Sequence, residues 1–142
     1  MADDTHRSVD LERVGTHLFR ATNSRGTTMT FGSGDGVGFT PIELLLVAIG
    51  GCTALDVEFI VGKRSEPESF SITVSGDKIR DGDGNRLTGL TVDMRATFPA
   101  GQGGDAARAV LPDALRKSHD RLCTVSRTVE LGTQVTSRLA DS

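Results

Sequence analysis

GFTPIELLLVAIGGCTALDV, residues 38–57, contains the best-defined secondary-structure element of this chain. Thr40 is a good helix N-cap, Pro41 suits the first helical position, and Glu43 completes a capping box. This pattern predicts a helix that begins at Pro41 and continues to about Gly62. Because the first half of the helix is apolar on all sides, we expect it to be buried on all sides.

Two adjacent glycines, Gly50 and Gly51, interrupt this helix just before Cys52. Each glycine costs about 1 kcal/mol relative to alanine in a helix interior. The pair therefore predicts either a kink or another part of the protein that approaches the helix backbone closely.

The flanking sequence shows strand and helix patterns separated by glycine-rich or polar turns. Together they predict a single α+β domain over residues 1–142. Its elements are expected in this order: a flexible arm at 1–14 that can end in a short strand, a hairpin over 15–31 with its turn at 23–26, the long helix, two strands around 70–74 and 90–96, a second helix over about 105–121 that contains Pro112, and a final strand at 128–139.

The composition argues against two classes of protein, nucleic-acid binders and membrane proteins. Sixteen Lys and Arg against nineteen Asp and Glu give a net charge of −3, and the chain has six Phe but no Trp or Tyr. A mildly acidic chain with so few aromatic residues is a poor nucleic-acid binder. No uninterrupted apolar run is long enough to span a membrane, and the N-terminus has no secretory h-region, so we expect a cytoplasmic protein with no membrane partner.

The same scarcity of aromatic residues bears on the oligomeric state. One chain of 142 residues has too few aromatic side chains to cover a helix that is apolar on all sides. We therefore expect an obligate homodimer.

Two cysteines, Cys52 and Cys123, are the main candidates for chemistry. No C-x-x-C motif is present, and the ordinary interpretation of such thiols is that they are buried and inert. His119 precedes Cys123 by four residues, so a Cys-His-Cys zinc site is conceivable, but no fourth ligand is evident and we expect no metal and no cofactor. The acidic run at 81–85 lacks the remaining ligands of a calcium loop and predicts a plain hairpin turn.

Two motifs together resemble the OsmC/Ohr family of osmotically inducible and organic-hydroperoxide-resistance proteins. Residues 41–52 are similar to the family's Pro-x-Glu-Leu-Leu-x(5)-Gly-Cys helix, and LCTVSRTVELGT, residues 122–133, is similar to its second cysteine segment. The resemblance covers roughly residues 15–138 and is strongest to the uncharacterised OsmC-like branch.

The resemblance implies an OsmC-like fold in an intertwined homodimer. It also implies a thiol peroxidase that reduces organic hydroperoxides and is recycled by a dithiol such as a lipoylated protein. On this mapping Cys52 is the peroxidatic cysteine, which becomes a sulfenic acid, and Cys123 is the resolving cysteine, which condenses with it to a disulfide.

A reactive thiol also needs a depressed pKa. Cys52 is predicted to lie mid-helix among apolar residues, where the helix dipole gives little help, so a cation must come from elsewhere. The resemblance implies an arginine in the first hairpin, for which Arg25 is the best match and Arg20 the second, together with a glutamate. In the well-studied peroxidases of the family the glutamate that pairs with this arginine directly follows the proline; that position is Ile42 here, and Glu43 stands one residue later.

A second hypothesis from a different class is a non-catalytic OsmC-like dimer. It would bind an apolar small molecule, and its cysteines would be packing residues or slow redox sensors. Thiol counts before and after peroxide treatment distinguish the two hypotheses.

Overall fold

The computed structural model of this chain describes residues 5–36 and 38–140. Its internal contacts divide it into two compact units, Met1–Leu45 and Leu46–Ser142. The long helix α1, Pro41–Val61, crosses the boundary between them.

The first unit contains a three-stranded antiparallel sheet in the order β1-β2-β3. Strand β2, Leu18–Asn23, pairs with β3, Thr28–Gly32, as the predicted hairpin requires. The side chain of Asn23 fixes the turn, because its Oδ1 accepts hydrogen bonds from the backbone N–H groups of Arg25 and Thr27. Strand β1, Val9–Gly15, occupies the second half of the predicted arm, and residues 1–4 of that arm lie outside the described residues.

The capping box predicted at the start of α1 is confirmed. The backbone N–H of Thr40 donates to Glu43 Oε1 at 2.9 Å, and the backbone N–H of Glu43 donates to Thr40 Oγ1 at 3.2 Å. These two bonds satisfy donors that the first helical turn would otherwise leave unpaired. The helix ends at Val61, one residue before the predicted end.

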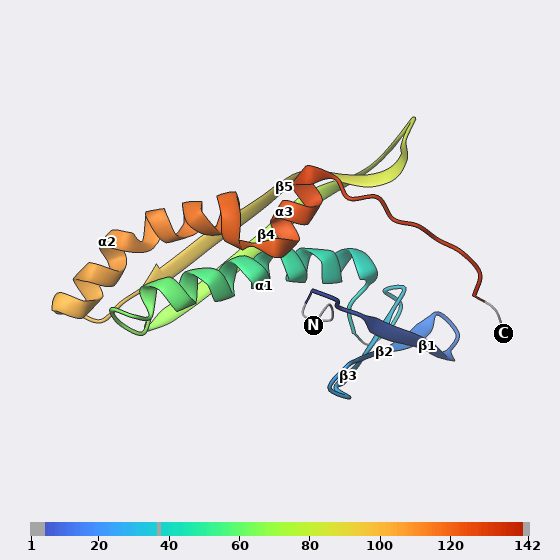
Figure 1. The fold of residues 1–142 in the computed structure, drawn as a ribbon, viewed down its shortest axis with the longest axis horizontal. Helices are drawn as coiled ribbons and strands as arrows, with labels where there is room; N and C mark the ends of the chain where they lie inside the picture. The colour runs from blue at the N-terminus through green and yellow to red at the C-terminus, as the bar shows by residue number, and fades with distance from the viewer. Residues whose placement is uncertain (1–4, 37, 141–142) are drawn as a thin grey trace. The chain divides into compact units, whose positions relative to one another are not determined.

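The second unit packs helices on a long hairpin (Figure 1). Strands β4, Ser69–Asp81, and β5, Gly84–Thr97, form this antiparallel pair, and its turn falls at the acidic run, as predicted. One face of the pair is polar and exposed, and the other meets α1 and helix α2, Gln102–Lys117. The core is formed by buried residues with partly buried ones around them: Val57, Val61, Phe98, Ala107 and Ala114, with Ile60, Phe70, Met94, Ala96, Val110, Leu111 and Leu115.

The predicted close approach to the helix backbone occurs at Gly50. A Cβ at this position would lie 2.4 Å from Cγ2 of Val74 and 3.3 Å from Cγ2 of Ile72, both on β4. Gly50 therefore lets α1 lie directly on the strand. At Gly51 a Cβ would meet nothing within 4 Å.

The predicted strand at 128–139 is wrong. Helix α3, Thr124–Leu131, occupies its first part, and residues 133–140 have no regular structure. Helix α2 also ends at Lys117, short of the predicted Arg121, and a π-helical turn, Ser118–Leu122, follows. The alternation of valine and threonine favours a strand locally, but Cys123 caps α3 at its N-terminus, and Gly132, with φ 72°, ends it in a left-handed conformation.

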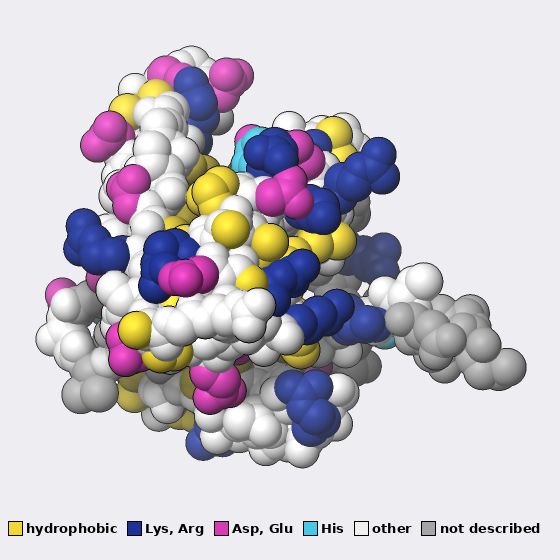
Figure 2. Space-filling model, turned by 90° about the vertical axis from the view of Figure 1, so that its left-hand side faces the viewer, with side chains coloured by type: hydrophobic (Ala, Val, Ile, Leu, Met, Phe, Trp, Pro, Cys, Tyr) yellow, Lys and Arg dark blue, Asp and Glu magenta, His cyan; other side chains and the backbone are white. Residues whose placement is uncertain are grey.

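By length and composition alone, helix α1 could cross a membrane; its mean hydropathy is 2.1. Only part of it is buried: Val57 and Val61 lie in the core, whereas residues 41–48 are exposed or half-buried, contrary to the burial expected from the sequence. Its other side is exposed at the apolar residues Val47, Leu55 and Phe59, the last of which is 73% exposed. Figure 2 shows hydrophobic side chains at the surface among charged ones on one face of the molecule.

Candidate active site

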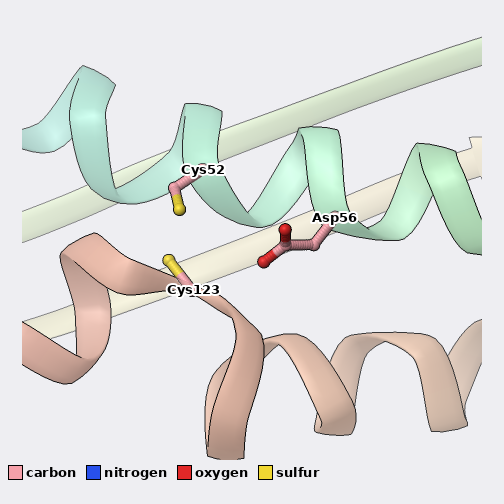
Figure 3. Close-up of side chains that lie close together, drawn as sticks. All are labelled: Cys52, Asp56 and Cys123. Carbon is pink, nitrogen blue, oxygen red and sulfur yellow. The ribbon is translucent and has the colours of Figure 1, made fainter. Parts of the chain in front are cut away.

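The two cysteines, far apart in the sequence, lie close together in the second unit (Figure 3). Cys52 is on α1, and Cys123 stands between the π-helical turn and α3. Their Sγ atoms are within 4.8 Å of each other, and both thiols are free. Cys123 is completely buried, whereas Cys52 is half-buried.

The N-terminus of α3 faces both sulfurs. The backbone N–H of Ser126 donates to Cys123 Sγ at 3.3 Å, and the backbone N–H of Val125 donates to Cys52. Thr53 Oγ1 lies 3.8 Å from Cys123 Sγ, and Ser126 Oγ lies 3.2 Å from it. Amide groups at the start of a helix stabilise negative charge, so this arrangement favours a thiolate in the pair.

The two thiols are unequal. Burial raises the pKa of Cys52; the N–H of Val125 offsets part of this effect, while Cys123 and the Asp56 carboxylate raise it further. Burial also acts to raise the pKa of Cys123, but hydrogen bonds from Ser126, Cys52 and Thr53 outweigh it and lower that pKa below its ordinary value. Of the two thiols, Cys123 therefore loses its proton more readily.

Sequence reasoning missed a third member of the site, Asp56. It lies one helical turn after Cys52 on α1, and its carboxylate is within 4.8 Å of both sulfurs. The buried Ser118 donates its hydroxyl to Asp56 Oδ2 at 2.9 Å. The i, i+4 spacing of Cys52 and Asp56 on a predicted helix is the signal that could have identified it.

An apolar cavity of about 390 Å³ lies near Cys123, although neither cysteine is among its lining residues. Thr53 and Ser126, which both contact Cys123 Sγ, lie in its wall. The remaining lining is apolar apart from two residues: Ile49, Leu90, Val92, Leu115 and Val129, with His119 and Glu130. A cavity of this composition suits an alkyl group.

The predicted thiolate-stabilising residues, Arg25 and Glu43, belong to the first unit, whereas the thiols belong to the second. Arg25 lies in the turn between β2 and β3, and Glu43 forms the capping box with Thr40. Arg20, the second choice, pairs with Glu12 at 2.7 Å on the exposed surface of the first sheet. Their roles toward Cys52 stay predictions.

His119 does not join the cysteines. Its Nδ1 lies 2.9 Å from Asp120 Oδ1, and its Nε2 lies 3.2 Å from Glu130 Oε2. These two carboxylates raise the pKa of His119 above its ordinary value. The residue that lies beside the two thiols is Asp56, and not His119, which the sequence offered as a metal ligand.

Comparison with known proteins gives relatives over most of the chain. An uncharacterised protein of Mycobacterium tuberculosis is 29% identical over 133 residues, which cover 92% of this chain and 94% of the relative. The crystal structure of a hypothetical protein from Aquifex aeolicus is 27% identical, with a TM-score of 0.71, and the match covers 90% of this chain and 89% of that one. An organic hydroperoxide resistance protein from Legionella pneumophila shares the fold at 14% identity and a TM-score of 0.54, with 86% and 88% covered.

The family model described as OsmC-like protein matches residues 32–138. This range contains both cysteines and Asp56, and it begins after Arg20 and Arg25. The mixed α+β fold, with two small sheets and three helices, agrees with this match. The chain therefore belongs to the OsmC-like protein family.

Proposed function

We propose that this protein is a thiol-dependent peroxidase that reduces organic hydroperoxides through Cys52 and Cys123. The observation that carries the proposal is the meeting of two free thiols, from α1 and from the start of α3, within 4.8 Å. The family contains proteins named for hydroperoxide resistance, of which the Legionella pneumophila protein is one.

The chemistry takes two steps in the protein. The Cys52 thiolate attacks the distal oxygen of the hydroperoxide, the O–O bond breaks, and the alkoxide takes a proton and leaves as an alcohol. Cys52 is then a sulfenic acid. The sulfur of Cys123 attacks it, water leaves, and a disulfide joins the two residues. A dithiol, such as a lipoylated protein, donates two electrons and restores both thiols.

Cys52 is proposed as the attacking residue because it is the more exposed of the two thiols. The pKa directions within the pair favour ionisation of Cys123 over Cys52, so the Cys52 thiolate needs a stabilising group from outside the pair. The apolar cavity near Cys123 would hold the alkyl part of the substrate. Arg25 and Glu43 are proposed to stabilise the Cys52 thiolate further.

The working form is proposed to be a cytoplasmic homodimer. The support is the apolar exposed side of α1, formed by Val47, Leu55 and Phe59, next to a glycine whose surroundings are open. A helix side of this composition requires cover in water. Sedimentation at micromolar concentration should show twice the 15.0 kDa mass of one chain, and a 15.0 kDa species would contradict the dimer.

The test of the peroxidase counts free thiols before and after one equivalent of tert-butyl hydroperoxide. We expect both thiols to disappear without crosslinks between chains. In Cys123→Ser the Cys52 sulfenic acid should persist, react with dimedone and advance to sulfinic acid under excess peroxide. In Cys52→Ser no sulfenic acid should form; dimedone labelling of Cys123 in this variant would instead reverse the two roles.

A second function has an observation of its own. The cavity is apolar and large enough for a small organic ligand, so a non-catalytic binding protein is the alternative. Unchanged thiol counts after peroxide treatment, together with saturable binding of a fluorescent apolar probe, would favour this alternative over the peroxidase.

A further inference from the structure

Three potential metal ligands converge at the thiol pair. The Sγ atoms of Cys52 and Cys123 and a carboxylate oxygen of Asp56 all lie within 4.8 Å of one another (Figure 3). Two of these residues are one turn apart on α1, and the third comes from the opposite segment before α3. The three atoms thus surround a common point from two sides.

The ligand types fit a particular class of ion. Two thiolates and one carboxylate suit Zn²⁺ and similar borderline or soft divalent cations, whereas Mg²⁺ and Ca²⁺ prefer oxygen alone. At bond lengths of about 2.3 Å to sulfur and about 2.1 Å to oxygen, two ligand atoms on tetrahedral zinc lie roughly 3.6–3.8 Å apart. Atoms already within 4.8 Å reach that spacing by small side-chain rotations.

Neighbouring groups hold the ligands in place. Ser118, which is buried, donates to Asp56 Oδ2 and fixes the direction of the carboxylate. The N–H of Ser126 and the hydroxyl of Thr53 lie within hydrogen-bonding distance of Cys123 Sγ. Partners of this kind orient metal ligands and commonly affect metal affinity by about 10- to 100-fold.

Electrostatics favours a cation at the same point. A carboxylate beside two thiols opposes their ionisation, because like charges at this separation repel one another. A divalent cation would turn this repulsion into attraction among three anionic ligands, and its binding would release thiol protons.

We propose that the reduced protein binds one Zn²⁺ per chain through Cys52, Cys123 and Asp56, with an open fourth position for water or an external thiol. The site exists only while both cysteines are reduced, because a disulfide removes both sulfur ligands. A bound ion would hold both thiolates and slow their reaction with hydroperoxide. This last consequence rests on the proposed peroxidase function; the metal site itself does not.

The direct experiment titrates the fully reduced, chelator-treated protein with Co²⁺ as a spectroscopic probe and then displaces it with Zn²⁺. We expect one ion per chain, thiolate-to-cobalt charge-transfer absorption from two sulfurs, and tetrahedral d–d bands. Cys52→Ser and Cys123→Ser should each weaken binding by at least about 100-fold. An absence of stoichiometric binding by the wild-type protein, or binding that survives Cys52→Ser, would overturn the proposal.

Asp56 has a matched control on the same helix, the exposed Glu58. Asp56→Asn should weaken Zn²⁺ binding by about 10- to 100-fold, while Glu58→Gln should leave it within about twofold. Asp56→Cys should retain binding and add the absorption of a third thiolate. If Asp56→Asn binds as tightly as wild type and Asp56→Cys leaves the cobalt spectrum unchanged, the carboxylate is not a ligand and the proposed site is wrong.

Two further measurements separate folding and peroxidase effects. Circular dichroism of each variant establishes that it is folded before its affinity is compared. Thiol oxidation by tert-butyl hydroperoxide in chelator tests the peroxidase without metal, and failure there leaves the metal titration unaffected. One equivalent of Zn²⁺ should slow thiol loss at least tenfold in wild type. An unchanged rate would overturn the protective role while leaving the site itself to be judged by the titration.

Discussion

The two units of this chain differ in how they bury apolar side chains. In the second unit Val57 and Val61 of α1 are completely buried against α2 and the β4–β5 pair. In the first unit none of the described residues 5–36 and 38–45 is buried, although β1 presents Val9 and Leu11. A domain needs two layers around a core, and the first unit supplies a single sheet. The contrast indicates that the second unit carries most of the stability of the isolated chain.

The largest expected change in the free energy of unfolding comes from truncating a buried residue of the second unit, and an exposed residue of the first unit serves as the control. Val57→Ala should lower the free energy of unfolding by about 2–3 kcal/mol, because two buried methyl groups are lost and a cavity remains. Leu11→Ala, the control in the first unit, should change it by less than about 0.5 kcal/mol in dilute protein. Urea unfolding measures both changes. A large loss for Leu11→Ala that grows with protein concentration would place Leu11 in the contact between two copies.

A somewhat smaller effect is expected at the glycine pair of α1. Gly50→Ala should lower the free energy of unfolding by about 1–3 kcal/mol, since the new Cβ would lie 2.4 Å from Val74 Cγ2 and would push helix and strand apart. Gly51→Ala meets no neighbouring atom within 4 Å and should stabilise α1 by up to about 1 kcal/mol. Thermal unfolding compares the two variants. Since these distances are within one chain, equal losses would mean that the second copy of the proposed dimer approaches the backbone at Gly51.

The smallest expected effect concerns pH and the end of the second unit. Asp120 and Glu130 raise the pKa of His119 in the folded chain, so its protonated form stabilises the fold. This contribution is complete below about pH 6.5 and is lost as the pH rises through the folded pKa. Because the imidazole is exposed, raising the pH from 6 to 8 should lower the melting temperature of wild type by only about 1–2 °C more than that of His119→Gln.

The control for this pH effect is His17→Gln in the first unit, whose melting temperature should follow that of wild type from pH 6 to 8. A pH dependence for His119→Gln equal to that of wild type would show that the ion pairs at His119 contribute nothing measurable. In that case the end of the second unit is held by apolar contacts alone.

Local signals explain which parts of the fold were predictable from the sequence. The start of α1 and the turn at Asn23 depend on residues within four positions of one another, so short patterns identify them. Helix α3 could not be predicted in this way. The valines and threonines of residues 124–131 favour a strand, and the segment is helical because Cys123 caps its N-terminus. Secondary-structure patterns of this kind are weak evidence where tertiary contacts compete.

The same error concealed part of the site. The family resemblance indicated Arg25 and Arg20, in the first hairpin, as the groups that stabilise a thiolate. The structure supplies the backbone N–H groups of Val125 and Ser126, which exist as free donors only because α3 begins there. The pairing of the two cysteines came from the family resemblance, and only folding of the second unit brings Asp56 beside them.

The π-helical turn at Ser118–Leu122 has a consequence for how this site tolerates insertions and deletions. The turn is closed by the N–H of Cys123, which donates to the carbonyl of Ser118 at 2.8 Å, so it holds one residue more than an α-helical turn. Deleting one residue there would convert it to ordinary helix and rotate Cys123 by about 100° away from Cys52. Homologues that keep a thiol pair of this geometry should therefore keep this segment at constant length, while the loop at 81–84 is free to vary.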